Sequence, residues 1–100
     1  MLLTDAILQL DALPEDAFIC VRRPWNSEAV VLIVPYSSDL RIPAEVTAQG
    51  FEYFLEVSTV REILEEFLKH KPSLHQITDF ILFYAENDAY PVWANELCEK

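Results

Sequence analysis

The 100 residues of the chain are enough for one domain with its own hydrophobic core. The formal net charge is −10, from 17 acidic against 7 basic side chains. This balance argues against nucleic acid and anionic membrane surfaces as partners, because both select Lys and Arg. A hydrophobic content of 52% with a single glycine indicates a folded chain. We therefore expect a single globular domain over 1–100.

Export, membrane and redox signals are also missing. The first five residues, MLLTD, have no basic segment and are not expected to be a signal peptide. The longest apolar run, at 29–35, is too short to span a bilayer. Cys20 and Cys98 lack the spacing of a metal or redox site. We expect a cytoplasmic protein.

The first third of the chain predicts a helix followed by a β-hairpin. Thr4 can cap a helix that ends at 14–16. Residues 17–21 (AFICV) and 29–35 (AVVLIVP) then predict two strands that pair as an antiparallel hairpin. The second run does not alternate, which predicts a central strand covered on both faces, or a strand under helices.

A short helix, a strand and a long helix are predicted next. Residues 43–49 favour a short helix ended by Gly50. Residues 51–57 alternate in part, which predicts a half-exposed strand with Phe51, Tyr53, Leu55 and Val57 on one face. A capping box of Thr59 and Glu62 should then open an amphipathic helix that runs to about residue 70.

The stretch 73–88 (SLHQITDFILFYAEND) predicts a central helix that is apolar on nearly every side. Ser73 and Gln76 match a capping box, and Asn87 is a plausible left-handed terminator. A buried strand over 77–85 is the alternative, because periodicity cannot assign a short apolar run.

Together these elements predict an α+β fold. Their order is helix, strand, strand, short helix, strand, helix, helix, which fits a small three-stranded antiparallel sheet packed against helices on one face. The last two helices should form an antiparallel hairpin across Lys71 and Pro72. A short helix from Ala94 is expected in the tail.

The sequence contains no recognisable catalytic constellation. His70 and His75 flank Pro72 without further ligands at metal-binding spacing. A single glycine excludes phosphate-cradling loops, and Cys20 shows no sign of activation. We expect no enzymatic activity, no cofactor and no metal.

Acidic and aromatic side chains mark a candidate partner-binding surface. Residues 1–21 and 72–99 contain four and five acids and no base, so they would form one negative face if the chain ends meet. The mixture near the end of the last predicted helix is typical of a surface that binds a basic protein. It consists of Tyr84, Glu86, Asp88, Tyr90 and Trp93.

Structural roles are the alternative for the aromatic residues of this set. Tyr90 and Trp93 would then pin the tail to the core. Trp25, the sixth candidate, is either an anchor of its loop or an exposed contact.

Three short segments resemble a known class of proteins. They are LPEDA at 13–17, the loop at Pro24 and Trp25, and YAENDAY at 84–90. They resemble small acidic bacterial immunity proteins, including those of contact-dependent growth inhibition. The resemblance implies a cytosolic protein that blocks a delivered toxin, often a basic nuclease. An acidic adaptor or regulatory protein for a cellular partner is the alternative function.

Overall fold

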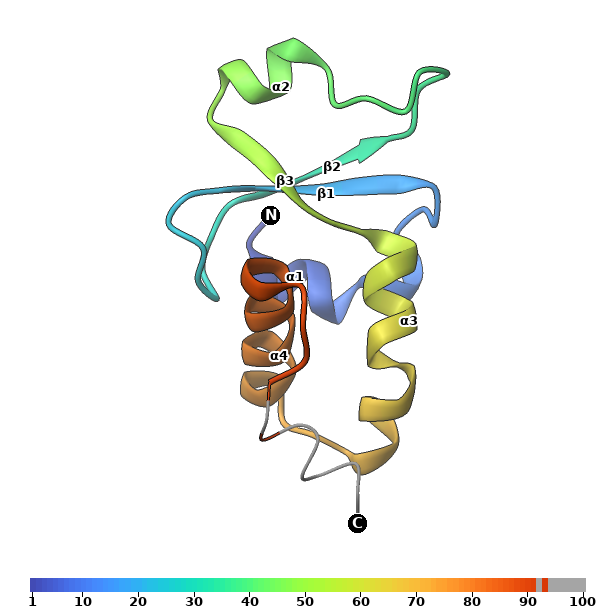
Figure 1. The fold of residues 1–100 in the computed structure, drawn as a ribbon, viewed down its shortest axis with the longest axis vertical. Coiled ribbons are helices and arrows are strands. Elements are labelled where there is room, and N and C mark those ends of the chain that lie inside the picture. Colours follow the sequence, from blue (N-terminus) through green and yellow to red (C-terminus); the bar gives the residue numbers. More distant parts are fainter. Residues whose placement is uncertain (92, 94–100) are drawn as a thin grey trace.

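The computed structural model describes residues 1–91 and 93, and it shows an α+β fold with a three-stranded antiparallel sheet (Figure 1). The predicted fold class and element order are confirmed. In chain order the elements are α1 (Leu3–Leu8), the 3-10 helix η1 (Leu10–Ala12), β1 (Ala17–Arg22), β2 (Val31–Pro35), α2 (Ala44–Ala48), β3 (Phe51–Glu56), α3 (Val57–Phe67), the 3-10 helix η2 (Leu68–His70) and α4 (Leu74–Asn87). The predicted tail helix from Ala94 lies outside the described residues.

Strand β1 is the centre of the sheet, whose order is β2-β1-β3. The predicted hairpin of β1 and β2 is confirmed, with Ile19 opposite Ile33. Of the two alternatives for 29–35, the central strand is wrong, because β2 is an edge strand in which Leu32 is exposed. Val31 packs in the main core with residues of the helices, which agrees with the other alternative, a strand under helices. The outer edge of β2 is partly covered by the amino terminus, where the Val31 N–H donates to the carbonyl of Met1 at 2.8 Å.

Strand β1 is buried on both faces, which explains its unbroken apolar run. Ile19 and Val21 belong to the main core with α1, α3 and α4. Phe18 and Cys20 belong to a second cluster with Val46 of α2. Figure 1 shows α2 on the opposite side of the sheet from the other helices. The expectation of helices on one face only is therefore incomplete.

A β-bulge breaks the predicted alternation of β3. The β1–β3 register shifts between Ile19 and Cys20, which pair with Leu55 and Tyr53 and leave Phe54 between them. Phe54 is buried in the main core at 2% exposure, whereas Tyr53 is 48% exposed. Tyr53 stays on the face of Phe51, whereas the bulge moves Leu55 to the main core, so the prediction that all four residues share one face is wrong from Leu55 onward.

Helices α1 and α3 begin at other residues than predicted, because a β-bridge or a strand comes directly before each of them. Strand β3 passes into α3 without a loop, so the N-cap is Glu56 and the Thr59 capping box does not form. Helix α1 is capped at Leu2 rather than Thr4, because an antiparallel bridge holds Leu2 against Val30. The predicted single helix is split into α1 and η1.

Helix α4 confirms the capping prediction and excludes the buried strand. The Gln76 N–H donates to Ser73 Oγ at 3.1 Å, and the Ser73 N–H donates to Gln76 Oε1 at 2.9 Å. The left-handed terminator is Asp88, with φ of 53°, and not Asn87. The helix is amphipathic rather than buried on nearly every side, since Phe80 is 3% and Phe83 is 40% exposed.

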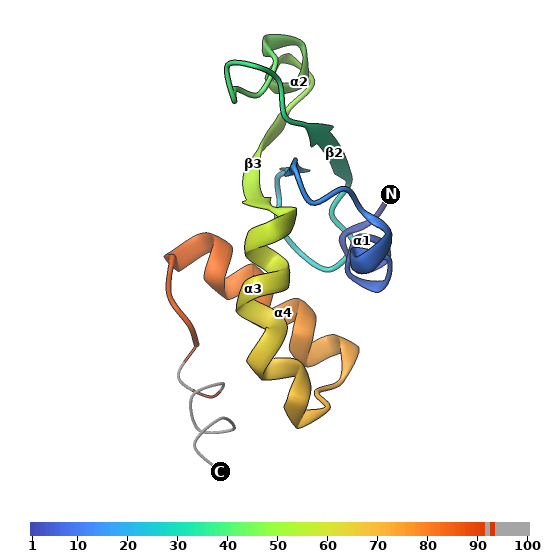
Figure 2. The ribbon, with the colours of Figure 1, turned by 90° about the vertical axis from the view of Figure 1, so that its right-hand side faces the viewer.

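Helices α3 and α4 form the predicted antiparallel hairpin. Helix α3 leads away from the sheet and α4 returns toward it, and the two cross in the turned view (Figures 1 and 2). The rings of Phe67 and Phe80 stack at 4.5 Å between the two helices. No helix in the described part of the chain has the length and hydropathy needed to cross a membrane.

Two phenylalanines of α4 test its assignment as an amphipathic helix. We expect Phe80→Ala to lower the free energy of unfolding by about 3–5 kcal/mol, because a buried ring is replaced by a cavity. Phe83→Ala should change it by less than about 1 kcal/mol, because that ring is half in water. Urea denaturation measures both, and equal losses would contradict the assignment.

Candidate functional site

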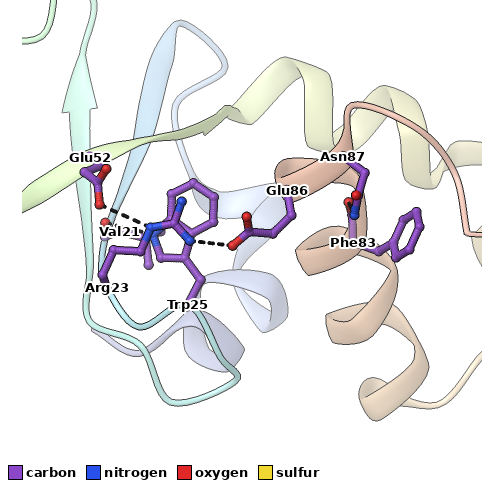
Figure 3. Close-up of polar contacts among 7 residues, drawn as sticks. All are labelled: Val21, Arg23, Trp25, Glu52, Phe83, Glu86 and Asn87. Atoms are coloured by element: carbon purple, nitrogen blue, oxygen red, sulfur yellow. Dashed lines mark hydrogen bonds and ion pairs between the residues drawn. The ribbon is translucent and has the colours of Figure 1, made fainter.

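Arg23 joins three segments that are far apart in the sequence (Figure 3). Its Nε lies 3.3 Å from Glu52 Oε2 of β3, and its Nη1 pairs with Glu86 Oε1 of α4. Its guanidinium also lies 3.6 Å from the centroid of the Trp25 ring. The end of α4 is therefore tied to the loop that follows β1.

Trp25 is an anchor of that loop. Its indole N–H donates to the Val21 carbonyl at 3.2 Å, and its ring meets Phe54 edge-on at 4.9 Å. One face of the ring is covered by Arg23. Of the two roles that the sequence left open, the structure places Trp25 in the supporting one.

The acids at the end of α4 have different surroundings. The charge of Glu86 is matched by Arg23, which explains how an acid is tolerated near a helix C-terminus. Asp88 is exposed, and no base pairs with it in the described residues. Asp79, one of the acids expected to join a face between the chain ends, lies 3.1 Å from His75 Nε2. Glu96 and Glu99 lie outside the described residues.

Tyr84, Tyr90 and Trp93 hold the segment after α4 against the helix pair. The Tyr90 ring lies 5.5 Å from both Phe80 and Tyr84, and the Trp93 ring lies 5.8 Å from Phe67. These ring contacts agree with the structural role that was the alternative for Tyr90 and Trp93. Tyr90 nevertheless remains 49% exposed, so its outer surface is available to a partner.

Tyr53 of β3 joins this region, which the sequence analysis missed. Burial raises the pKa of the Tyr53 hydroxyl, and the nearby Glu56, Tyr84 and Asp88 add to the shift. Burial likewise raises the pKa of Tyr84, with contributions from Asp88, Tyr90 and Glu62. The Tyr53 ring itself meets Phe18 edge-on at 6.1 Å, and the Tyr84 ring lies beside Tyr90. We call the set of side chains linked by these pKa shifts the tyrosine–acid face. It consists of Tyr53, Tyr84, Tyr90, Glu56, Glu62 and Asp88.

The surroundings of Cys20 do not favour covalent chemistry. Cys20 is fully buried, and burial raises the pKa of its thiol, which disfavours the nucleophilic thiolate. Among residues 1–91 and 93, no three His, Cys, Asp or Glu side chains are placed to hold a metal ion.

The ion pair between Arg23 and Glu86 should make only a small contribution to stability. Both side chains are about half exposed, so water and salt screen their attraction. A double-mutant cycle with Arg23→Ala and Glu86→Ala should give a coupling energy of about 0.2–1 kcal/mol by urea denaturation. A coupling above about 2 kcal/mol would mean that the pair is desolvated, contrary to the structure.

Tyr53 and Tyr84 should ionise above their ordinary pKa of 10.0. Because ionisation is harder in the folded state, their contribution to stability is fully present below about pH 10 and is lost as the pH rises further. Ultraviolet titration of tyrosinate measures this directly. Asp88→Asn should lower the apparent pKa of Tyr84, and an unchanged titration would separate Asp88 from this face.

Comparison with known proteins gives one family match. Residues 1–93 match the family model described as Domain of unknown function (DUF7716). No curated protein and no solved structure matches the chain. The matched segment contains all the elements of the fold and all residues of the tyrosine–acid face. The chain therefore belongs to the DUF7716 family.

Proposed function

We propose that this protein is a cytoplasmic immunity protein that binds a basic bacterial toxin and covers its active site or another functional surface. The observation that carries the proposal is the tyrosine–acid face, together with a net charge of −10. The resemblance of the segments at 13–17, 24–25 and 84–90 to acidic immunity proteins supports the same function. The proposal assigns the protein no catalytic role.

The composition of this face suits a basic protein. Tyr53 and Tyr90 are each about half exposed, so their rings can be buried by a partner without unfolding the protein. The carboxylates of Glu56, Glu62 and Asp88 supply the negative charge that steers a basic partner. A nuclease binds phosphates through Lys and Arg, so an acidic protein surface competes for the same residues.

The surrounding contacts hold this face in place before binding. Arg23 ties α4 to the loop that contains Trp25, and Trp93 packs on Phe67. A surface that is already ordered loses less conformational entropy when a partner binds. In this proposal Tyr84, Asp88 and Tyr90 contact the partner together with Tyr53, and Trp25, Glu86 and Trp93 support them.

The double variant Tyr53→Thr/Asp88→Asn tests the proposed contact surface. Asn tolerates the left-handed conformation of Asp88, and Tyr53 is exposed, so we expect the variant to fold. Its Kd for the toxin should rise at least about tenfold, because an aromatic contact and a steering charge are both removed. Glu28→Gln/Glu45→Gln, at exposed positions elsewhere, is the control and should bind as the native protein does.

The toxin itself can be found by pull-down from the source cell. A captured basic protein that kills cells when expressed alone, and is harmless when co-expressed with this chain, supports immunity. Rescue by the control but not by Tyr53→Thr/Asp88→Asn assigns the activity to the tyrosine–acid face. A captured protein that is harmless alone contradicts immunity and favours the adaptor function.

A further inference from the structure

A second acidic surface lies between η1 and α3, in a groove of about 490 Å³. Its apolar lining consists of Leu10, Leu64 and Leu68. Leu68 is 47% exposed, whereas the other two are buried. Four carboxylates also line the groove, from Asp11, Glu15, Glu62 and Glu65. The groove thus combines accessible apolar surface with negative charge.

Arg61, the one base that lines the groove among residues 1–91 and 93, serves an internal role. Its Nη2 donates to the backbone carbonyls of Leu10 at 3.0 Å, Asp11 at 3.3 Å and Leu13 at 2.8 Å. Its Nε is buried. Arg61 therefore fastens η1 and the following turn to α3, and its guanidinium is held by carbonyls rather than by the carboxylates.

The four carboxylates of the groove have no basic partner within the part of the chain that the structure describes. Glu66 differs although it is next to Glu65, since it pairs with Lys69 at 3.1 Å. Four negative charges beside one internally bound guanidinium give the groove a net negative charge. Narrow surfaces lined by one sign of charge concentrate that potential and attract the opposite charge.

We propose that this groove docks a basic amphipathic segment of a partner protein. Apolar side chains of the segment would cover Leu68, while its Lys or Arg side chains would reach the carboxylates at the rim. A second copy of this chain is a poorer occupant, because two chains of charge −10 repel each other. The inference does not depend on the proposed function, since the groove uses another set of side chains. Only Glu62 belongs to both surfaces.

The first test uses a short synthetic peptide of Leu and Lys with an amphipathic pattern. It should bind at low ionic strength and shift the methyl resonances of Leu64 and Leu68. Glu15→Gln/Glu65→Gln should raise the Kd of this peptide about tenfold. The control Glu45→Gln/Glu66→Gln removes the same charge outside the groove and should change the Kd by less than about twofold.

A second variant distinguishes docking through apolar contacts from attraction by charge alone. Leu68→Ala removes an exposed side chain, so it should weaken peptide binding without changing the thermal unfolding of the protein. A peptide with Ser in place of Leu should bind much more weakly than the Leu-containing peptide. Tyr53→Thr/Asp88→Asn should leave peptide binding unchanged, so failure of the groove and failure of the proposed function are distinguishable.

Several results would overturn the inference. One is a wild-type protein that does not bind the peptide at low ionic strength. Another is that Glu15→Gln/Glu65→Gln and the control variant weaken peptide binding equally. A third is that the Ser-containing peptide binds as tightly as the Leu-containing one. Either result would mean that the peptide is attracted by the overall charge of the protein and not by the groove. Self-association that the groove variants abolish in sedimentation would assign the groove to a second copy of the chain.

Discussion

The burial of β1 on both faces is the constraint on which the rest of the structure depends. Residues 17–21 are all buried between the main core and the cluster under α2. Strand β1 also pairs with both other strands, so all strand pairing in the sheet involves β1. Its ends lead into the two regions that we propose as binding surfaces. The loop with Arg23 and Trp25 leaves one end, and the acidic turn after η1 enters the other.

The proposed binding surface is built by contacts between distant segments. Arg23, after β1, reaches Glu52 on β3 and Glu86 on α4. The β3 bulge places Phe54 and Leu55 in the main core, and Tyr53, on the opposite face, remains half exposed with Glu56 and Asp88 near its hydroxyl. Each of these contacts is weak in water, but together they place aromatic and acidic side chains on a rigid support.

Local features of the fold could be predicted from the sequence, whereas strand order and ion pairs between distant residues could not. The capping box of Ser73 and Gln76 depends on residues three positions apart, and the structure contains it. The order of the strands, the bulge and the Arg23–Glu86 pair depend on residues tens of positions apart. A continuous apolar run likewise does not say whether burial comes from helices, from strands or from a loop. For this reason neither the pairing of Glu86 with Arg23 nor the edge position of β2 could be predicted.

The central claim is that negative charge on this protein guides a basic toxin to the tyrosine–acid face. Stopped-flow measurement of the association rate constant over a range of ionic strengths tests it most directly. The account predicts that this rate constant falls steeply as salt is added, while the dissociation rate changes little. An association rate constant that does not depend on salt would contradict the account.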